Sequence, residues 1–351
     1  MNAMNTNDNV FAVRVDAGER IGIGHLMRCL TIARRLRQCG KQVHFLLTPL
    51  PRQIEKLFQS YQFAYKYMHA DAASLVDAAQ TLSIVKELGA SWLIVDGYPF
   101  GTEYQKRVYT DFFGLMLIDA LGSPQHNYAH ILLNPNIYAR EEYYTAREPR
   151  TKLLLGLEYL PIRPEFTSYT PRQRLASQPL RNVLVSLGGS DPDNVTGAVI
   201  QFFMEFPAPL HCKIVLGPAS QHVKMLEKMA DSHTGRFEVL HSPDDMPGLM
   251  DWSDVAVLAG GSTVWEAFTM GVPCILLSYA DNQLRVAPRL GELEYALYSG
   301  HFNGRLPTKF DDDMNAFFHN GDLRASFSTR VRKLIDGQGS VRIVTEMLAG
   351  Y

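Results

Sequence analysis

A histidine in a glycine-bearing turn is the residue of this sequence best suited to move a proton near neutral pH. His25 ends the string VRVDAGERIGIGH, in which a predicted strand at 10–15 runs through Gly22 and Gly24 into a predicted helix. Glycines let a backbone approach a ligand closely, and the first N–H groups of a helix attract anions. The pattern indicates either a general base beside an anion site or a tight turn whose histidine only caps or packs.

This turn differs from the two common nucleotide-binding fingerprints. A G-x-G-x-x-G string would need a third glycine where Met27 stands, and no acidic residue closes the next predicted strand at 43–47. No G-x-x-x-x-G-K-[ST] string occurs in the chain either. The sequence therefore argues against NAD and against a Walker-type phosphate loop, and we expect no cofactor.

Two further turns of small residues follow predicted strands at 183–187 and 255–258. The first contains Gly188, Gly189 and Ser190, and the second contains Gly261, Ser262 and Thr263. Hydroxyl and N–H groups at a helix start can hold phosphate oxygens, so two such turns predict a diphosphate site. Each turn alone is also typical of a capped helix without a ligand.

Polar side chains near these turns could complete a nucleotide-sugar site. Glu266 lies one turn into a predicted helix, where its carboxylate could accept hydrogen bonds from two ribose hydroxyls or merely favour the helix dipole. Asn282 and Gln283 follow the predicted strand 274–277 and could bind hydroxyl or acetamido groups. Tyr98 follows the predicted strand 92–96, where it could line a sugar pocket or pack over the sheet end.

The pair Asp191 and Asp193 has a spacing that could hold a divalent metal. Pro192 separates the two aspartates, and a helix is predicted to begin near Asn194. We therefore interpret Asp193 as a helix cap or a turn residue and predict no metal site.

The alternation of short β-branched runs with amphipathic helices predicts an α/β protein with parallel sheets. We expect two doubly wound, Rossmann-like domains that face each other across a cleft, with ligands at the carboxyl ends of the strands. The predicted ranges are 10–165 for the first domain, 166–181 for a Pro-rich linker and 182–351 for the second domain, whose last helix is expected to pack back on the first.

The composition excludes several classes of function. The chain has 351 residues, 34 basic and 36 acidic, with a formal net charge of −2. This balance argues against a nucleic-acid or membrane-surface partner, and no apolar run is long enough to span a membrane. Four scattered cysteines and a polar start without an apolar core predict a cytoplasmic protein with no signal peptide. The oligomeric state stays open.

Taken together, the strings of the chain resemble the hydrolase family of pseudaminic acid biosynthesis, which removes UDP from a 2,4-diacetamido-2,4,6-trideoxy hexose. The resemblance extends from Val13 to about Gly291 and rests on the strings RVD, GIGHLMRCLTIARRL, VDGY, LLGLEYLPIRPEF, VSLGGSDPDN, AGGSTVWEAFTMGVPCILL and ADNQ. That family is similar in fold to the MurG-type glycosyltransferases, which are called GT-B. The resemblance implies that the second domain holds most of the nucleotide.

The resemblance also implies roles for individual residues. It makes His25 the base that activates water, places Tyr98 and Asn282 at the sugar and Glu266 at the ribose, and surrounds the diphosphate with the two glycine-rich turns. By analogy, the loop from Ser242 to Met246 presents backbone groups to uracil. The remaining candidates for substrate binding in the same strings are Asp16, Gly22, Gly24, Arg28 and Gln283.

The implied reaction is metal-independent, inverting hydrolysis of a UDP-linked sugar that releases UDP and free sugar. A GT-B transferase that passes the sugar to an acceptor hydroxyl is the alternative, because the same base and diphosphate site would serve it. A sugar-nucleotide binding subunit without activity is the third hypothesis. Ala120 and His130 stand where many members of the family have aspartates, which leaves the identity of the sugar open.

Overall fold

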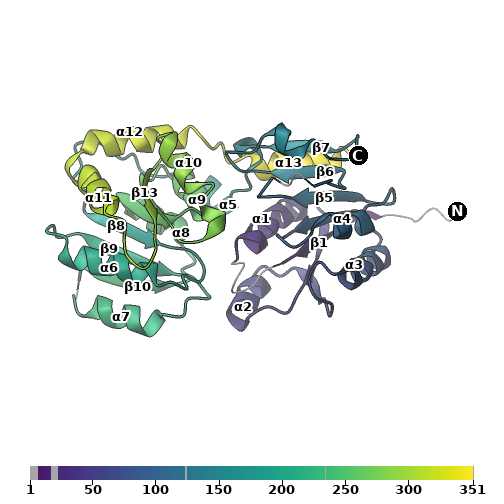
Figure 1. The fold of residues 1–351 in the computed structure, drawn as a ribbon, viewed down its shortest axis with the longest axis horizontal. Coiled ribbons are helices and arrows are strands. Elements are labelled where there is room, and N and C mark those ends of the chain that lie inside the picture. Colours follow the sequence, from purple (N-terminus) through teal and green to yellow (C-terminus); the bar gives the residue numbers. More distant parts are fainter. Residues whose placement is uncertain (1–6, 17–22, 123–124, 234, 351) are drawn as a thin grey trace. The chain divides into compact units, whose positions relative to one another are not determined.

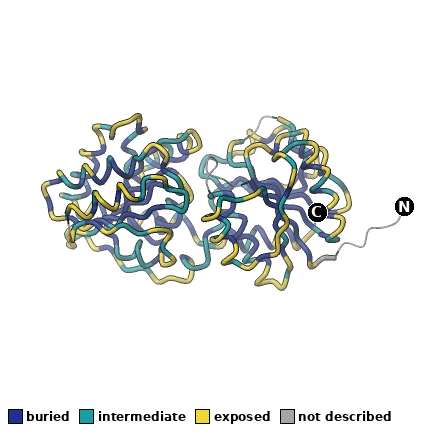
Figure 2. The backbone as a smooth tube through the Cα atoms, turned by 90° about the horizontal axis from the view of Figure 1, so that it is seen from below, coloured by how far each residue is buried: buried dark blue, intermediate teal, exposed yellow. Residues whose placement is uncertain are grey.

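The structure is a computed structural model and describes residues 7–16, 23–122, 125–233 and 235–350. The chain divides into two compact units, one formed by Met1–Ile162 with Gly337–Tyr351 and the other by Arg163–Asp336 (Figure 1). In both units buried strands form the interior, and the exposed residues lie on the surrounding helices and loops (Figure 2). Both units are α/β, which confirms the predicted fold class.

The described part of the first unit contains one sheet and helices on both of its faces. Its strands are β1 (Asn7–Val15), β2 (Gln42–Leu47), β3 (Ala64–Tyr67), β4 (Ala90–Asp96), β5 (Gly114–Ile118), β6 (Ile131–Asn134) and β7 (Lys152–Leu155). Its helices are α1 (Gly24–Gln38), α2 (Arg52–Ser60), α3 (Leu75–Leu88), α4 (Thr102–Val108) and α13 (Gly339–Leu348), with short 3-10 turns η1 (Glu141–Tyr144) and η2 (Leu157–Tyr159).

The strands of the first unit run parallel in the order β3-β2-β1-β4-β5-β6-β7. Side chains alternate between the faces of a strand, so Phe11 and Val13 pack with α1, α2 and α13, whereas Val10 and Ala12 pack with α3 and α4. The same alternation places Arg14 on the α3 side, where its guanidinium pairs with Asp77 of α3. Arg14, the arginine of the string RVD, is thus a buried structural residue.

The described part of the second unit repeats this plan. Its strands are β8 (Asn182–Ser186), β9 (His211–Leu216), β10 (Phe237–His241), β11 (Val255–Ala259), β12 (Cys274–Ser278) and β13 (Leu297–His301). Its helices are α5 (Pro164–Thr167), α6 (Val195–Glu205), α7 (Val223–Asp231), α8 (Met246–Trp252), α9 (Thr263–Thr269), α10 (Ala287–Glu292), α11 (Lys309–His319) and α12 (Gly321–Arg332), with the 3-10 turn η3 (Asp281–Gln283).

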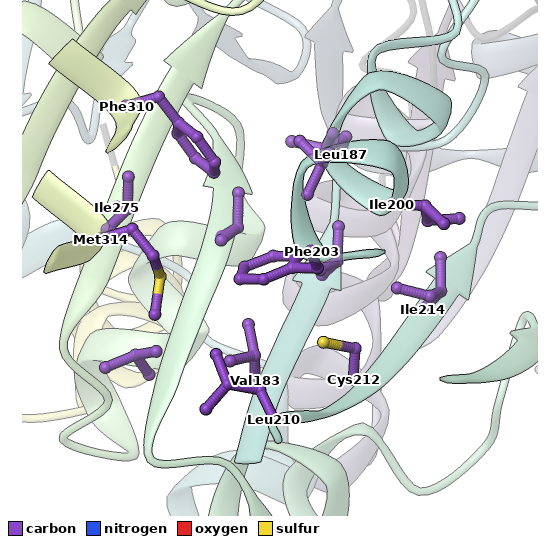
Figure 3. Packing of buried hydrophobic residues seen from close by; sticks show 14 of the residues in the cluster. Val183, Leu187, Ile200, Phe203, Leu210, Cys212, Ile214, Ile275, Phe310 and Met314 are labelled. Atoms are coloured by element: carbon purple, nitrogen blue, oxygen red, sulfur yellow. The ribbon is translucent and has the colours of Figure 1, made fainter. Parts of the chain in front are cut away.

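The second sheet is also parallel, in the order β10-β9-β8-β11-β12-β13. One of its faces is covered by α6, α7 and α11, whose apolar side chains form a continuous core with the strands. In Figure 3, Phe203 of α6 and Phe310 of α11 lie in one core cluster with Val183 of β8, a strand of this sheet. Their burial supplies much of the stability of the unit, because apolar surface removed from water is the main driving force of folding.

Three strands absent from the sequence-based prediction, β3, β7 and β13, are all edge strands. In β3 the first three residues, Ala64 to Lys66, are exposed. An edge strand pairs on one side only, so it needs no continuous apolar run and carries a weaker sequence signal.

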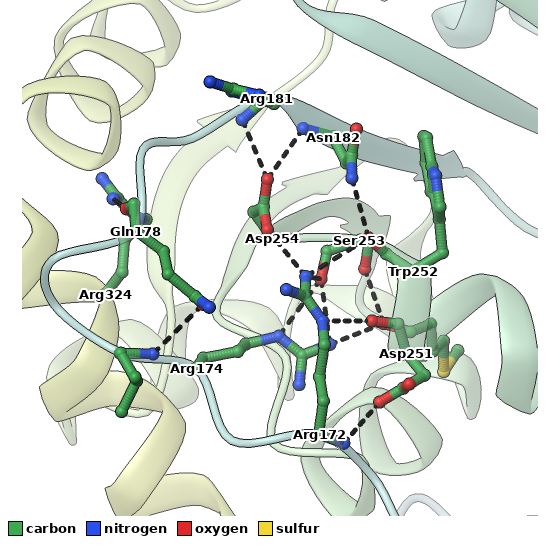
Figure 4. Close-up of polar contacts among 12 residues, drawn as sticks. Arg172, Arg174, Gln178, Arg181, Asn182, Asp251, Trp252, Ser253, Asp254 and Arg324 are labelled. Carbon is green, nitrogen blue, oxygen red and sulfur yellow. Dashed lines mark hydrogen bonds and ion pairs between the residues drawn. The ribbon is translucent and has the colours of Figure 1, made fainter.

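The predicted linker 166–181 is part of the second unit in the structure. Arg172 donates hydrogen bonds to the Asp251 carbonyl at 2.5 Å and to Asp254 Oδ1 at 2.6 Å, and Arg174 donates to the Met250 carbonyl at 2.6 Å (Figure 4). Several of these oxygens belong to the C-terminal end of α8, whose last carbonyls have no partner within the helix. The segment predicted as a linker therefore anchors α8 through arginine side chains.

The C-terminal segment lies in the first unit, so the second unit ends at Asp336 and not at residue 351. Ile343, Val344 and Met347 of α13 are buried in the core that also contains α1. At Gly339, which begins α13, an added Cβ would lie 2.1 Å from the carbonyl oxygen of Leu160. Glycine is required there because α13 touches the backbone of the first unit.

Candidate functional sites in the two units

Each sheet has a switch point between two neighbouring strands whose following connections run in opposite directions. In the first unit the strands are β1 and β4, and in the second they are β8 and β11. Ligands of doubly wound sheets bind beyond the carboxyl ends of such strands. Asp16 and Tyr98 follow β1 and β4, and the two predicted diphosphate turns follow β8 and β11, so each group of candidates is placed at a switch point.

Asp96, the last residue of β4, is the centre of the polar site in the first unit. It is fully buried, and the Arg28 guanidinium contacts both carboxylate oxygens at 2.5 Å. Burial alone would raise the pKa of Asp96, but the charge of Arg28 and the hydrogen bonds from Arg28 and His25 outweigh burial and hold this pKa well below its usual range. Asp96 is therefore an ionised acceptor at all ordinary pH values.

The position of Asp96 determines which nitrogen of the His25 ring carries the proton. Nδ1 of His25 lies 2.6 Å from Asp96 Oδ1 and 2.8 Å from Nη2 of Arg28. A guanidinium only donates and an ionised carboxylate only accepts, so the shorter contact is a hydrogen bond only when Nδ1 carries the proton. We assign the Nδ1–H tautomer, which leaves the lone pair of the neutral ring on Nε2.

Cys29 also contacts the carboxylate, with its Sγ 3.4 Å from Asp96 Oδ2. Burial and the nearby carboxylate raise the pKa of Cys29 well above its usual range, so the side chain is a thiol at ordinary pH. Cys29 thus fills the space behind Asp96 and is no nucleophile.

Tyr98 lies against His25 on the same side of the sheet. The two rings make an edge contact with centroids 4.6 Å apart, and Tyr98 is 40% exposed. Asp16 is buried, and its backbone N–H donates to the Asp96 carbonyl at 3.0 Å. Tyr98 is thus both in contact with the candidate base and accessible, which fits the predicted position beside a sugar.

Of the two candidate glycines before His25, Gly24 lies among the described residues. A Cβ added at Gly24 would have no described atom within 4 Å, so no contact among the described residues requires glycine there. Gly22 lies outside the described residues. The approach of a ligand to Gly24 stays a prediction.

The first small-residue turn of the second unit, after β8, is shaped by close backbone contacts. Gly188 has φ +95°, and the hydroxyl of Tyr279 lies 2.8 Å from where its Cβ would be. That hydroxyl donates to the Leu187 carbonyl at 2.5 Å. At Gly217, an added Cβ would lie 2.4 Å from the Cα of Gly189. These contacts hold the turn of Gly188, Gly189 and Ser190 against the end of β9.

Asp193 lies in the turn before α6, and the side chain that caps this helix belongs to Asp191. Asp191 accepts hydrogen bonds from the backbone N–H groups of Val195 and Thr196, both at 2.9 Å. Its backbone turns through φ +43°, and this brings the carboxylate over the helix end. Two of the donors expected to serve an anion are therefore already used by the protein.

The second turn leads into α9, which carries Glu266 in its first turn. Ser262 is exposed, and its hydroxyl makes no capping hydrogen bond to the helix. A Cβ at Gly261 would meet open space, and Thr263 is half-buried. In this turn Gly261 and Ser262 are thus exposed, and Thr263 is partly so.

Glu266 is paired with an arginine that the sequence-based prediction missed. Arg163 Nε donates to Oε1 of Glu266 at 2.6 Å, and Nη2 donates to Oε2 at 2.9 Å. These residues are 103 positions apart, and no local spacing signals their contact. Asp96 escaped the prediction for the same reason, although its place as the last residue of the predicted strand 92–96 was a usable signal.

The other predicted binding residues of the second unit divide into structural and accessible ones. Gln283 is buried, and its Oε1 accepts from the Tyr279 N–H at 2.9 Å, so it shapes the loop after β12. Asn282 beside it is exposed. Met246 is buried as the first residue of α8, and Asp245 caps that helix through the Gly248 N–H at 2.8 Å.

The described residues contain neither a metal-binding cluster nor a membrane-spanning helix. No group of three or more His, Cys, Asp or Glu side chains among them is arranged to hold a metal ion. Within the same ranges, no helix combines the length and the apolarity that crossing a bilayer demands.

Comparison with known proteins finds relatives of the whole chain, although no protein-family model matches it. Spore coat polysaccharide biosynthesis protein SpsG of Bacillus subtilis is 25% identical over 337 residues, which cover 93% of this chain and 94% of SpsG. The UDP-2,4-diacetamido-2,4,6-trideoxy-beta-L-altropyranose hydrolase of Campylobacter jejuni is 24% identical over 284 residues, which cover 80% of this chain and 96% of the hydrolase.

Among solved structures, MurG of Acinetobacter baumannii superimposes with a TM-score of 0.68 at 16% identity, covering 97% of this chain and 99% of MurG. A similarity of this extent includes both sheets and therefore applies to the whole architecture. The chain thus has the GT-B fold of two Rossmann-like α/β units, and in sequence it resembles the UDP-2,4-diacetamido-2,4,6-trideoxy-beta-L-altropyranose hydrolase.

Proposed function

We propose that this protein is an enzyme acting on a nucleotide sugar, and specifically an inverting hydrolase of a UDP-linked 2,4-diacetamido-2,4,6-trideoxy hexose. The similarity to a hydrolase of that substrate supports the reaction, and the GT-B fold supports a UDP-linked substrate. The product sugar would serve nonulosonic acid synthesis, and the four free cysteines agree with a cytoplasmic location.

The observation that carries the proposal is the hydrogen bond from His25 Nδ1 to the ionised carboxylate of Asp96. This arrangement orients the ring, leaves Nε2 as the proton acceptor and stabilises the imidazolium that forms when Nε2 takes a proton. A water molecule bound at Nε2 then attacks C1 of the sugar while its proton passes to the ring. The C1–O bond breaks, and UDP leaves with the electron pair, so the configuration at C1 inverts.

In the same proposal the second unit binds UDP. Glu266 accepts hydrogen bonds from the ribose hydroxyls. The hydroxyl groups of Ser262 and Thr263, which are exposed and partly exposed residues, donate to the diphosphate, whose negative charge grows as the bond breaks. Tyr98 and Asn282, both accessible, contact the sugar. The exposed loop at Ser242 leads into α8 and offers its backbone to uracil.

The test compares wild type and His25→Ala on purified UDP-linked diacetamido sugars, with and without EDTA. We expect the variant to lose about 10²- to 10⁴-fold in turnover, the usual contribution of a general base, while it binds UDP with unchanged affinity. NMR of the initial product should show free sugar with inverted configuration. Near-wild-type turnover by His25→Ala, or retention at C1, would contradict the mechanism.

A glycosyltransferase is the second candidate, because the superimposed structures include MurG. It predicts slow release of free sugar that accelerates when an acceptor hydroxyl is supplied, with the sugar recovered on the acceptor. Hydrolysis predicts a rate independent of added acceptors.

A further inference from the structure

The ion pair between Arg163 and Glu266 has the geometry of a fork that grips both carboxylate oxygens. The two donor distances are 2.6 Å and 2.9 Å, and the side chains are only 19% and 11% exposed. The guanidinium also lies over the ring of buried Phe166 with its carbon 4.8 Å from the ring centroid, and Glu165 approaches it at 4.0 Å. Arg163 is therefore held on one side while its fork contacts Glu266 on the other.

The number of lone pairs on the Glu266 carboxylate determines what else it can bind. An ionised carboxylate has about four acceptor positions, two on each oxygen. A fork that bonds to both oxygens occupies one position on each and leaves one on each. Two remaining acceptors, one per oxygen, match the two neighbouring hydroxyls of a ribose, whereas a 2′-deoxyribose offers only one hydroxyl.

We propose that Arg163 is a positioning residue which orients the Glu266 carboxylate for both ribose hydroxyls and thereby makes the second unit select ribonucleoside over 2′-deoxyribonucleoside diphosphates. This inference rests on the proposed function, since it requires that Glu266 faces the ribose. Arg163 acts through Glu266 and needs no contact with the substrate.

The fork is essential to the inference, because a lysine would keep the charge and lose the orientation. An ammonium is a point charge that can pair with one carboxylate oxygen only, so it does not fix the orientation of the carboxylate group. Removing the cation altogether would leave the part-buried Glu266 carboxylate without its partner, which lowers stability as well as order. Arg163→Lys is therefore the informative variant, and Arg163→Met is the second one.

The experiment measures the dissociation constants of UDP and 2′-deoxy-UDP by titration calorimetry for the full-length protein and its variants. We expect wild type to bind UDP about 10- to 100-fold more tightly than 2′-deoxy-UDP, the range for one hydrogen bond to a charged acceptor. In Arg163→Lys and Arg163→Met this ratio should fall below about 5-fold, mainly through weaker binding of UDP.

The control is Arg289→Lys, which alters an exposed Arg–Glu pair of the same unit whose partner is Glu292. This variant should keep the wild-type ratio of dissociation constants. Melting temperatures of all variants show whether a change is due to unfolding, which would weaken the binding of both ligands equally. A wild-type ratio near one, or an unchanged ratio in both Arg163 variants, overturns the inference while UDP binding itself upholds the proposed nucleotide site. Failure of wild type to bind UDP at all overturns both.

Discussion

The imidazole of His25 and the carboxylate of Asp96 are 2.6 Å apart, although 71 positions separate the two residues in the chain. His25 comes from the start of α1 and Asp96 from the end of β4, the strand that lies beside β1 in the sheet. This contact turns a histidine in a glycine-rich turn into an oriented base. It is the relationship on which the proposed chemistry depends most directly.

Replacing Asp96 by Asn should impair turnover and spare nucleotide binding. An amide can donate to Nδ1 and so stabilise the wrong tautomer, and it does not stabilise the imidazolium, so kcat should fall about 10²- to 10⁴-fold. Steady-state kinetics and calorimetry with UDP measure the two effects separately. Cys29→Ala is the matched control, since it removes a 3.4 Å contact to the same carboxylate without changing its charge, and its kcat should stay within about 10-fold of wild type.

The pH dependence of the wild-type enzyme should exclude Asp96 as the titrating group. Its pKa lies well below the usual range, so the carboxylate stays ionised above about pH 4, the ordinary value for aspartate. Any loss of kcat between pH 5 and pH 8 therefore reports another group. In Cys29→Ala, any fall of kcat toward the acid end of this window should occur at the same pH as in wild type.

The buried pair of Arg14 and Asp77 should stabilise the first unit only as a pair. Both side chains are fully buried, and two hydrogen bonds of 2.8 Å and 3.1 Å join them. Arg14→Met leaves the Asp77 carboxylate without its cation, which should lower the free energy of unfolding by about 3–5 kcal/mol. The double variant Arg14→Met/Asp77→Leu should recover part of that loss.

Hydrogen exchange of amides in β1 and β4 under increasing urea measures these changes for the first unit by itself. The exposed pair of Lys66 and Glu87 supplies the control, and Lys66→Met should change the stability by less than about 1 kcal/mol. Equal losses in the single and double Arg14 variants would show that the ion pair makes no contribution of its own.

His130 should make the first unit lose stability as the pH falls. Burial lowers its pKa to about 4, and its Nδ1 accepts the Leu115 N–H at 2.9 Å, which requires an unprotonated nitrogen. The unfolded chain therefore binds one more proton than the folded chain between about pH 6.5 and pH 4, and stability falls through this window as pH falls, by at most about 1.4 kcal/mol per pH unit.

His130→Gln keeps an oxygen that can accept the Leu115 N–H but does not titrate. Its stability, measured by the same exchange experiment, should depend less on pH in this window than that of wild type. Above pH 7 the difference between the two proteins should be constant. Parallel curves from pH 7 down to pH 4 would show that His130 does not titrate in this way.

The strands at the centre of each sheet could be predicted from the sequence, as could the helices that begin at Gly24 and Thr263. Their apolar runs and glycine-bearing turns are local, and local patterns determine local structure. The edge strands β3, β7 and β13 were missed because pairing on one side places few demands on their residues. The sequence led us to expect the last helix to pack back on the first domain, whereas its particular core contacts with α1 and the end of the second unit at Asp336 are seen only in the tertiary structure.

For the candidate site, the sequence by itself determined that His25 lies in the first turn of a helix that follows a glycine-bearing turn, and that Glu266 lies in the first turn of another helix. Only the tertiary structure decided which charged partners these side chains have. Asp96 reaches His25 because β4 lies beside β1, and Arg163 reaches Glu266 across 103 positions because α5 packs on α9. Contacts between distant segments depend on how sheets and helices pack, and no spacing within one segment records them.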